Sequence, residues 1–258
     1  IDTQLVWMKD AKEIAKLEKH IESSYGEGIE AALQYNKHAM DLLNIENFEH
    51  SLKLLKQAEN VLANVPDSQS RIKVYAITCN NYGCFYKKAR KPNVALKYLK
   101  LAAKHEKYAQ QDPLNIASTH LNITAILSVL KKHEEALVEA VEALKLLESI
   151  NVKEEFWSNL YGDWMRTDYA NNFFTTLAIA HYNVGAEQEY LSMLNEAVET
   201  YVTGANKVAE FFGATHALVK QLTNCAVAAE ERRESNDRSL LHRREARKRA
   251  GSSIPRNF

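Results

Sequence analysis

The sequence predicts an all-α protein, a right-handed solenoid built from helical hairpins. Two observations lead to this prediction. Gly (8) and Pro (4) are scarce among the 258 residues, while the strong helix formers Ala, Leu, Lys and Glu dominate. Small residues also recur opposite large ones at a fixed spacing, which lets two short antiparallel helices approach closely.

The spacing is clearest in residues 79–103, CNNYGCFYKKARKPNVALKYLKLAA. Gly83, Ala95 and Ala102 are small, and bulky apolar or aromatic residues lie between them. Lys91-Pro92-Asn93 is the expected turn between the two helices. With Gly83 taken as position 8, the stretch resembles the tetratricopeptide (TPR) repeat, W-x2-L-G-x2-Y followed by A-x3-F.

An asparagine at position 6 marks each return of the pattern. Asn81 is followed by Asn122, Asn183 and Asn224, at intervals of 41, 61 and 41 residues. A period of 41 interrupted once by 20 residues is hard to obtain by chance. Another register would place Gly185 in a turn. We prefer Gly185 inside a first helix, because NEAVETY then begins the second helix.

The repeats divide the chain into three parts. Residues 1–34 are predicted to be an N-terminal helical cap, or the tail of a preceding domain, with a break at Ser23-Ser24-Tyr25-Gly26. Residues 35–233 are expected to form about five repeats. Residues 234–258 are expected to form a basic C-terminal helix and tail.

The 20 extra residues lie near 150–170 and read INVKEEFWSNLYGDWMRTDY, with five aromatic side chains. One interpretation is an aromatic, acidic lid over a binding groove. We favour the other, an extra helix whose aromatic residues fill a gap between neighbouring repeats, because clustered aromatics usually pack.

The sequence of one linker indicates which group of TPR proteins the chain resembles. Residues 205–219, ANKVAEFFGATHALV, are similar to the linker of long-repeat TPR proteins, of which kinesin light chain is the best-known member. The chain departs from that pattern because no Pro follows His216 and one residue is missing between His216 and Asn224. The resemblance covers roughly residues 35–233 and implies an α-solenoid that binds other proteins.

The asparagines predict where a partner binds. Positions 2, 6, 9 and 13 of a first helix share one face, which points away from the second helix. An amide there offers the donor and the acceptor that an extended peptide needs. Resemblance to kinesin-light-chain-type repeats implies that stacked asparagines grip a peptide main chain. The predicted peptide-binding residues are Asn81, Asn122, Asn183, Asn224, Lys88 and Lys220. The competing interpretation is that the asparagines only tie adjacent helices together.

Signals of catalysis or of a resident cofactor are missing from the sequence. The nine histidines are scattered without a metal-ligand spacing, and no GxSxG or phosphate-cradling Gly-rich loop occurs. We therefore predict no enzyme activity, no metal and no cofactor. A regulatory TPR module of a larger enzyme remains an alternative. The three cysteines, an odd number without a CxxC, favour a reducing compartment.

The C-terminal end suggests a second kind of partner. Residues 238–258 carry seven basic residues and one acidic residue, a net charge of +6 in a chain whose total is zero. Such an arm could contact tubulin or another acidic surface, or it could be a solvated capping helix with a disordered end. No aromatic residues alternate with the basic ones, which argues against nucleic acid. No apolar run is long enough to span a membrane.

The predicted function is a non-catalytic scaffold that binds an extended peptide or a partner helix in the concave groove. The alternative is a structural subunit of a large cytoskeletal or ciliary axonemal assembly that contacts tubulin or dynein-type partners. The expected location is the cytoplasm, with the cytoskeleton or the cilium axoneme as more specific sites.

Overall fold

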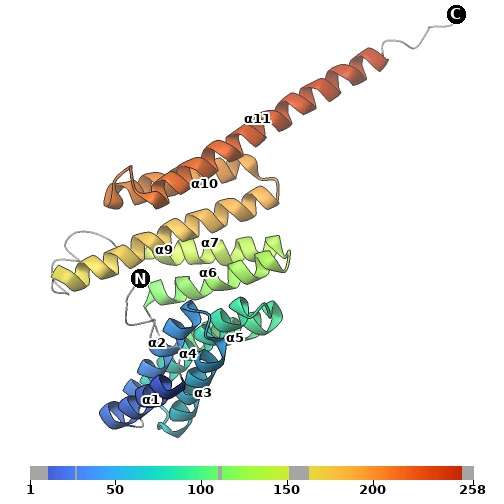
Figure 1. Cartoon of the computed structure of the whole chain (residues 1–258). Coiled ribbons are helices and arrows are strands. Elements are labelled where there is room, and N and C mark those ends of the chain that lie inside the picture. Colours follow the sequence, from blue (N-terminus) through green and yellow to red (C-terminus); the bar gives the residue numbers. More distant parts are fainter. Residues whose placement is uncertain (1–10, 27, 110–111, 151–162, 252–258) are drawn as a thin grey trace, which may run out of the picture. The chain divides into compact units, whose positions relative to one another are not determined.

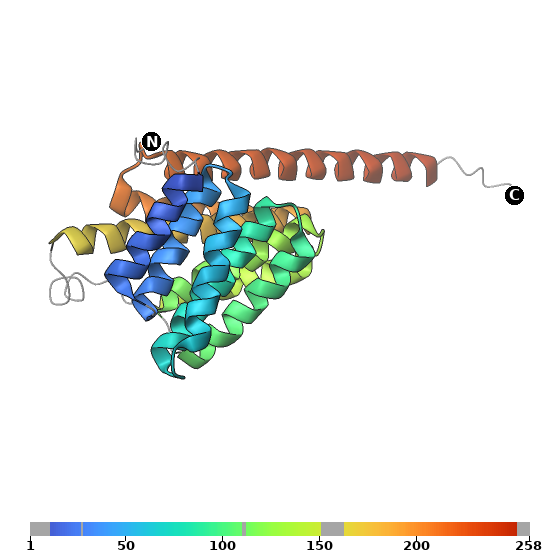
Figure 2. The ribbon, with the colours of Figure 1, turned by 60° about the horizontal axis from the view of Figure 1, so that its bottom comes forward.

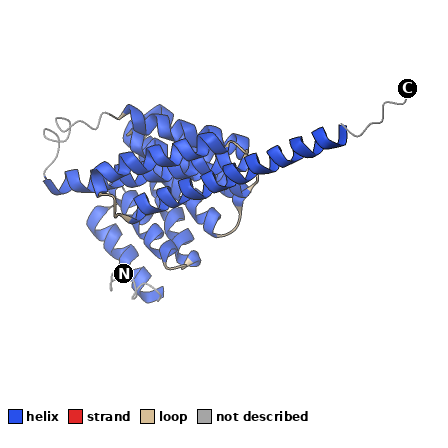
Figure 3. Cartoon of the chain, turned by 90° about the horizontal axis from the view of Figure 1, so that it is seen from above, coloured by secondary structure: helices blue, strands red, loops and turns tan. Residues whose placement is uncertain are grey.

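The computed structural model describes residues 11–26, 28–109, 112–150 and 163–251. In these residues every regular element is a helix (Figure 3), which confirms the predicted all-α class. The chain divides into two compact units, residues 1–150 and 151–258. None of the described helices is long and apolar enough to cross a membrane.

Antiparallel hairpins build both units (Figure 1). In the first unit, α1 (Ala11–Tyr25) precedes the hairpins α2 (Ile29–Asn44) with α3 (Phe48–Asn64), α4 (Gln69–Lys88) with α5 (Pro92–Ala109), and α6 (Pro113–Val129) with α7 (His133–Ser149). In the second unit, α9 (Asp163–Tyr190) pairs with α10 (Leu194–Phe212), and α11 (Ala217–Gly251) follows. This succession confirms the predicted repeats of two helices.

The helices of a hairpin approach closely where the sequence places a small residue. A Cβ added at Gly83 would lie 2.4 Å from the Leu99 side chain, and one at Gly185 would lie 2.5 Å from the Tyr201 ring. Both distances are too short for any other residue without a shift of the neighbour. Because Gly185 lies inside α9, the preferred register of the third repeat is confirmed.

One turn geometry joins the helices of each described hairpin. In the first turn the Asn47 N–H donates to the Leu42 carbonyl and the Glu46 N–H to the Leu43 carbonyl. These are the two hydrogen bonds of the Schellman motif. The left-handed residue of this motif is usually Gly, but here φ values of 56° to 63° are adopted by Glu46, Arg90, Lys131 and Ser192.

The second turn differs from the expected one. It consists of residues 89–91, and Pro92 is already the first residue of α5. Proline suits this position because its fixed φ matches the helix and its missing N–H would have no partner within the helix. The predicted turn Lys91-Pro92-Asn93 was therefore placed too far along the chain.

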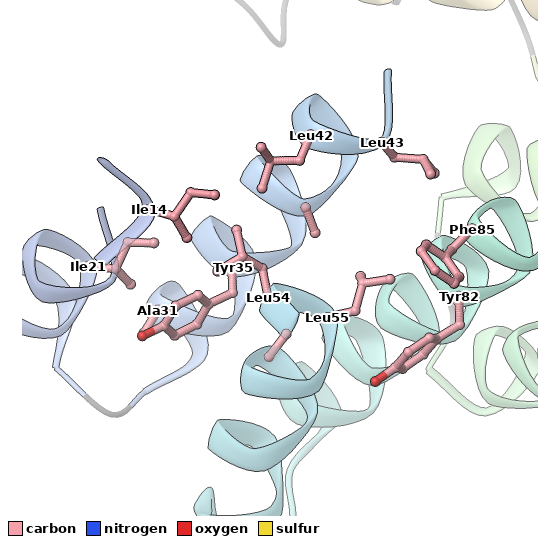
Figure 4. Packing of buried hydrophobic residues seen from close by; sticks show 12 residues of the cluster. Ile14, Ile21, Ala31, Tyr35, Leu42, Leu43, Leu54, Leu55, Tyr82 and Phe85 are labelled. Carbon is pink, nitrogen blue, oxygen red and sulfur yellow. The ribbon is translucent and has the colours of Figure 1, made fainter. Parts of the chain in front are cut away.

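The N-terminal helix covers the core of the first unit. Ile14 and Ile21 of α1 are buried against Tyr35 of α2, and the same cluster continues through α3 to Phe85 of α4 (Figure 4). Gly26 follows α1 with a φ of 64°, so the helix breaks at Gly26, whereas Ser23, Ser24 and Tyr25 of the predicted break still belong to α1. Packing of α1 therefore gives the first hairpin an apolar neighbour on its outer side.

The predicted insertion lies mostly outside the described residues. Phe156, Trp157 and Tyr161 fall outside them, and so does the side chain of Trp164. Tyr169, already inside α9, is half-buried. Whether the aromatic residues pack between repeats stays a prediction.

The last helix continues beyond the repeat pattern. α11 is one uninterrupted helix of 35 residues (Figure 2), and the predicted basic helix from residue 234 is its second half. Every side chain of residues 234–244 is exposed. Arg238 and Glu234, one turn apart, form an ion pair at 3.7 Å.

Candidate functional site

In the first unit, Asn81 ties two first helices together. It is only 8% exposed, and its Nδ2 donates to Oδ1 of Asn36 on α2 at 2.9 Å. Asn36 is itself buried and donates to the Ala32 carbonyl at 2.9 Å and to Thr78 Oγ1 at 2.8 Å. The donor of Asn81 is therefore used inside the protein.

Asn122 forms a second bond of this kind. Its Nδ2 donates to Oδ1 of Asn80 on α4 at 3.1 Å. In both cases the amide at position 6 donates to an amide at position 5 of the preceding first helix. We call this contact an amide tie. Sequence reasoning missed the acceptors Asn36 and Asn80. The signal that could have revealed them is that each is an Asn at position 5 of the repeat before the donor.

The asparagines of the second unit lie in different surroundings. Asn183 on α9 is half-buried and Asn224 on α11 is exposed. Within the described residues, neither side chain makes a hydrogen bond. The residues one repeat earlier at position 5 are Leu121 and Tyr182, neither of which carries an amide. The amide donors and acceptors of Asn183 and Asn224 are therefore not used within the described residues.

The two predicted lysines also differ. Lys88 Nζ donates to the Leu43 carbonyl at 3.0 Å, where it binds one of the last carbonyls of α2. Lys220 lies exposed on α11, one turn before Asn224. Lys88 thus belongs with the helix ties of the first unit, and Lys220 shares a helix face with Asn224.

The seam between α9 and α11 holds a pocket of about 450 Å³, the seam pocket. It is lined by Tyr182, Ala186, Glu189, Tyr190, Tyr201, Cys225, Ala228 and Arg232. A smaller cavity of about 50 Å³ shares Tyr182 and continues along the same two helices to Ile179 and Leu218. Ile179, Tyr182 and Tyr190 remain 42%, 37% and 60% exposed.

The charges inside the seam pocket neutralise each other. Glu189 accepts a hydrogen bond from the Tyr201 hydroxyl at 2.8 Å and forms an ion pair with Arg232. Burial raises the pKa of Tyr201, so its hydroxyl stays a donor, and burial likewise raises the pKa of the free thiol Cys225. The pocket therefore suits an uncharged apolar side chain better than an ion.

A buried carboxyl lies behind the second amide tie. Glu106 of α5 is 3% exposed, and its Oε1 accepts a hydrogen bond from Thr119 Oγ1 at 2.7 Å. Its Oε2 is buried without a hydrogen bond. Burial raises the pKa of Glu106, and the Thr119 hydrogen bond and His120 only partly counter this effect. Among the described residues, no group of three or more His, Cys, Asp or Glu side chains could hold a metal.

Solved structures resemble the chain across most of its length. A protein of P. anserina, assigned to the kinesin light chains and built of nearly identical TPR-like repeats, has a TM-score of 0.59 with 11% identity, covering 88% of this chain and 99% of its own. This chain has the TPR-like fold. A single-substitution variant of that protein gives a TM-score of 0.57 with 12% identity, covering 85% and 95%.

BtubC (BKLC) from P. vanneervenii has a TM-score of 0.51 with 15% identity, covering 89% of this chain and 93% of its own. No family model and no curated protein sequence matches the chain. At these identities the likeness concerns the fold alone. TPR-like folds typically mediate protein–protein interaction through surfaces formed by their stacked repeats.

The amide tie predicts that two of the asparagines differ in their effect on stability. Asn81→Ala should lower the free energy of unfolding by about 1–3 kcal/mol, because Asn36 Oδ1 is left buried without its donor. Asn224→Ala, the matched control at an exposed position, should leave it within about 0.7 kcal/mol of the original value. Urea titrations of both variants measure this, and equal effects would show that the tie does not stabilise the fold.

The buried carboxyl predicts a pH-dependent stability. A raised pKa in the folded state means that Glu106 contributes stability at low pH, which is lost as the pH rises toward that pKa. Glu106→Gln should therefore gain stability relative to the original protein between pH 4.5 and pH 7.5. The control is Glu135→Gln, because the Lys132 hydrogen bond lowers the pKa of that exposed carboxyl. Urea titrations at both pH values would contradict the account if Glu106→Gln gained no more than the control.

Proposed function

We propose that the protein is a non-catalytic scaffold that binds an extended peptide or a partner helix along its first helices, with the seam pocket as the anchoring site. The observation that supports this most is that two amides without a hydrogen bond among the described residues, Asn183 and Asn224, are chain neighbours of the pocket-lining residues Tyr182 and Cys225. Amides that donate and accept suit a peptide main chain, and the pocket suits one of its side chains.

The spacing of the aromatic residues fits such a ligand. Tyr182 and Tyr190 are eight residues apart on α9, which is about 12 Å along a helix. Ala186 lies between them on the pocket wall, where a small side chain leaves room. A bulky side chain of the ligand would enter between the tyrosines, while Asn183 and Asn224 hold its main chain.

The proposal reassigns half of the predicted binding residues. Asn81, Asn122 and Lys88 already donate to protein acceptors, so we assign them to the helix ties. Asn183, Asn224 and Lys220 remain as ligand-binding residues. The site is thus concentrated in the second unit instead of extending evenly over all repeats.

Peptides selected from a random 12-residue display library on the immobilised chain test this proposal. Asn183→Ala/Asn224→Ala should raise the Kd of selected peptides about tenfold, because two main-chain hydrogen bonds of about 0.5–1.5 kcal/mol each are lost. Bound peptide should also slow alkylation of Cys225, which lines the pocket. Fluorescence anisotropy and mass spectrometry give the two measurements.

The matched control is Asn93→Ala/Asn115→Ala, which removes two exposed asparagines of the first unit. It should leave both the Kd and the alkylation rate unchanged. Peptides that bind both double variants equally well, with Cys225 unprotected, would show that the seam between α9 and α11 is not the binding site.

A second candidate function rests on the exposed half of α11. We propose that this arm contacts tubulin or another acidic surface, as a structural subunit of a cytoskeletal or ciliary axonemal assembly would. The support is the net charge of +6 over residues 238–258 together with the exposure of every side chain in residues 234–244. The proposed location is then the cytoskeleton or the axoneme.

Microtubule co-sedimentation tests the arm. Arg238→Gln/Arg243→Gln/Arg244→Gln should at least halve the bound fraction at about 50 mM salt, and higher salt should weaken binding of the original chain because exposed charges are screened. Microtubules stripped of their acidic C-terminal tails are the control and should bind both chains weakly. Unchanged binding of the triple variant to intact microtubules would exclude the arm as the contact.

A further inference from the structure

The first unit carries a lysine-rich surface that neither the repeat pattern nor the proposed groove uses. Residues 87–107 contain eight Lys and Arg residues and one acidic residue, Glu106. The buried side of α5 consists of Ala95, Leu99, Ala102, Glu106 and Ala109. Its other side presents what we call the lysine face, formed by Lys97, Lys100, Lys104 and Lys107, all exposed.

The protein itself does not neutralise the lysine face. Within the described residues, none of its four members makes an ion pair or a hydrogen bond. Glu106 points inward and is held by Thr119. The field of Lys100 reaches Glu135 on α7, but that carboxylate is bound by Lys132 Nζ at 2.8 Å. Four like charges therefore remain on one stripe of a single helix.

We propose that the lysine face of α5 docks an extended acidic segment of a partner polypeptide. The lysines follow each other at three-, four- and three-residue intervals and span about 15 Å along the helix. An extended chain places every second side chain on one side at intervals of about 6.6 Å. Lysine stems are long and flexible enough to match the intervals of about 5 Å on the helix to this spacing. About five residues of an extended chain would cover the stripe, with about three acidic side chains on the side that faces the lysines.

An acidic polypeptide fits the lysine face better than a nucleic acid. Lysine is a point charge without the planar fork with which Arg grips phosphate. No aromatic side chain lies between the four lysines on this face, and Tyr108, 68% exposed, follows only at the end of α5. Stacking of bases on alternating aromatic residues, the usual basis of single-strand binding, is therefore not available.

The experiment measures anisotropy of a fluorescent hexaglutamate peptide with the full chain at about 50 mM salt, and hexaglutamine serves as the uncharged peptide. Lys100→Ala/Lys104→Ala should raise the Kd about twofold to thirtyfold, since exposed charge pairs contribute about 0.2–1 kcal/mol each. The control Lys16→Ala/Lys37→Ala removes the same charge from exposed positions on α1 and α2 and should leave the Kd unchanged. Thermal unfolding confirms that each variant is folded.

Three outcomes would overturn the proposal. Equal weakening by both lysine pairs would mean that only net charge matters. Weakening by Arg243→Gln/Arg244→Gln but not by Lys100→Ala/Lys104→Ala would place the peptide on the arm of α11. Tighter binding of oligouridylate than of hexaglutamate, lost in Lys100→Ala/Lys104→Ala, would identify the lysine face as a nucleic-acid surface. None of these outcomes bears on the seam pocket, so the two proposals fail separately.

Discussion

Close contact between a small and a large residue is the constraint on which each hairpin depends. Leu99 and Tyr201 occupy the space that a Cβ at Gly83 or Gly185 would need. Since protein interiors are packed without spare volume, these contacts fix both the distance and the register of the two helices. The shared turn geometry then follows, and four residues other than Gly adopt left-handed φ values to preserve it.

Once the hairpins are fixed, the contacts between successive first helices decide where a surface is open. The ties of Asn81 to Asn36 and of Asn122 to Asn80 join the first helices of the first unit directly. In the second unit, Tyr182 replaces the amide acceptor, and the seam of α9 with α11 contains a pocket. The residue at position 5 thus decides whether an asparagine at position 6 finds an amide acceptor one repeat earlier.

The sequence predicted the helices, their pairing and the register, because the small residues at Gly83, Gly185 and Ala95 are visible without knowledge of the fold. It did not predict which asparagines are used internally, because that depends on how far adjacent helices are offset along their axes. With one helix shifted by a single residue, two position-6 amides would face each other. In the observed arrangement, position 6 of one first helix instead pairs with position 5 of the preceding one. The spacing of Lys97 and Lys100 is visible in the sequence. That these lysines lie on the exposed side of α5 follows only once the opposite side of the helix is known to be buried.

The continuity of α11 has a mechanical consequence. Cys225, Ala228 and Arg232 on its first half form one wall of the seam pocket, and the same helix continues to Gly251 without a break. An uninterrupted helix of this length, about 52 Å, bends only gently. A pull or a twist applied to the exposed half would therefore act on the same helix that forms the pocket wall, beside the ion pair between Glu189 and Arg232.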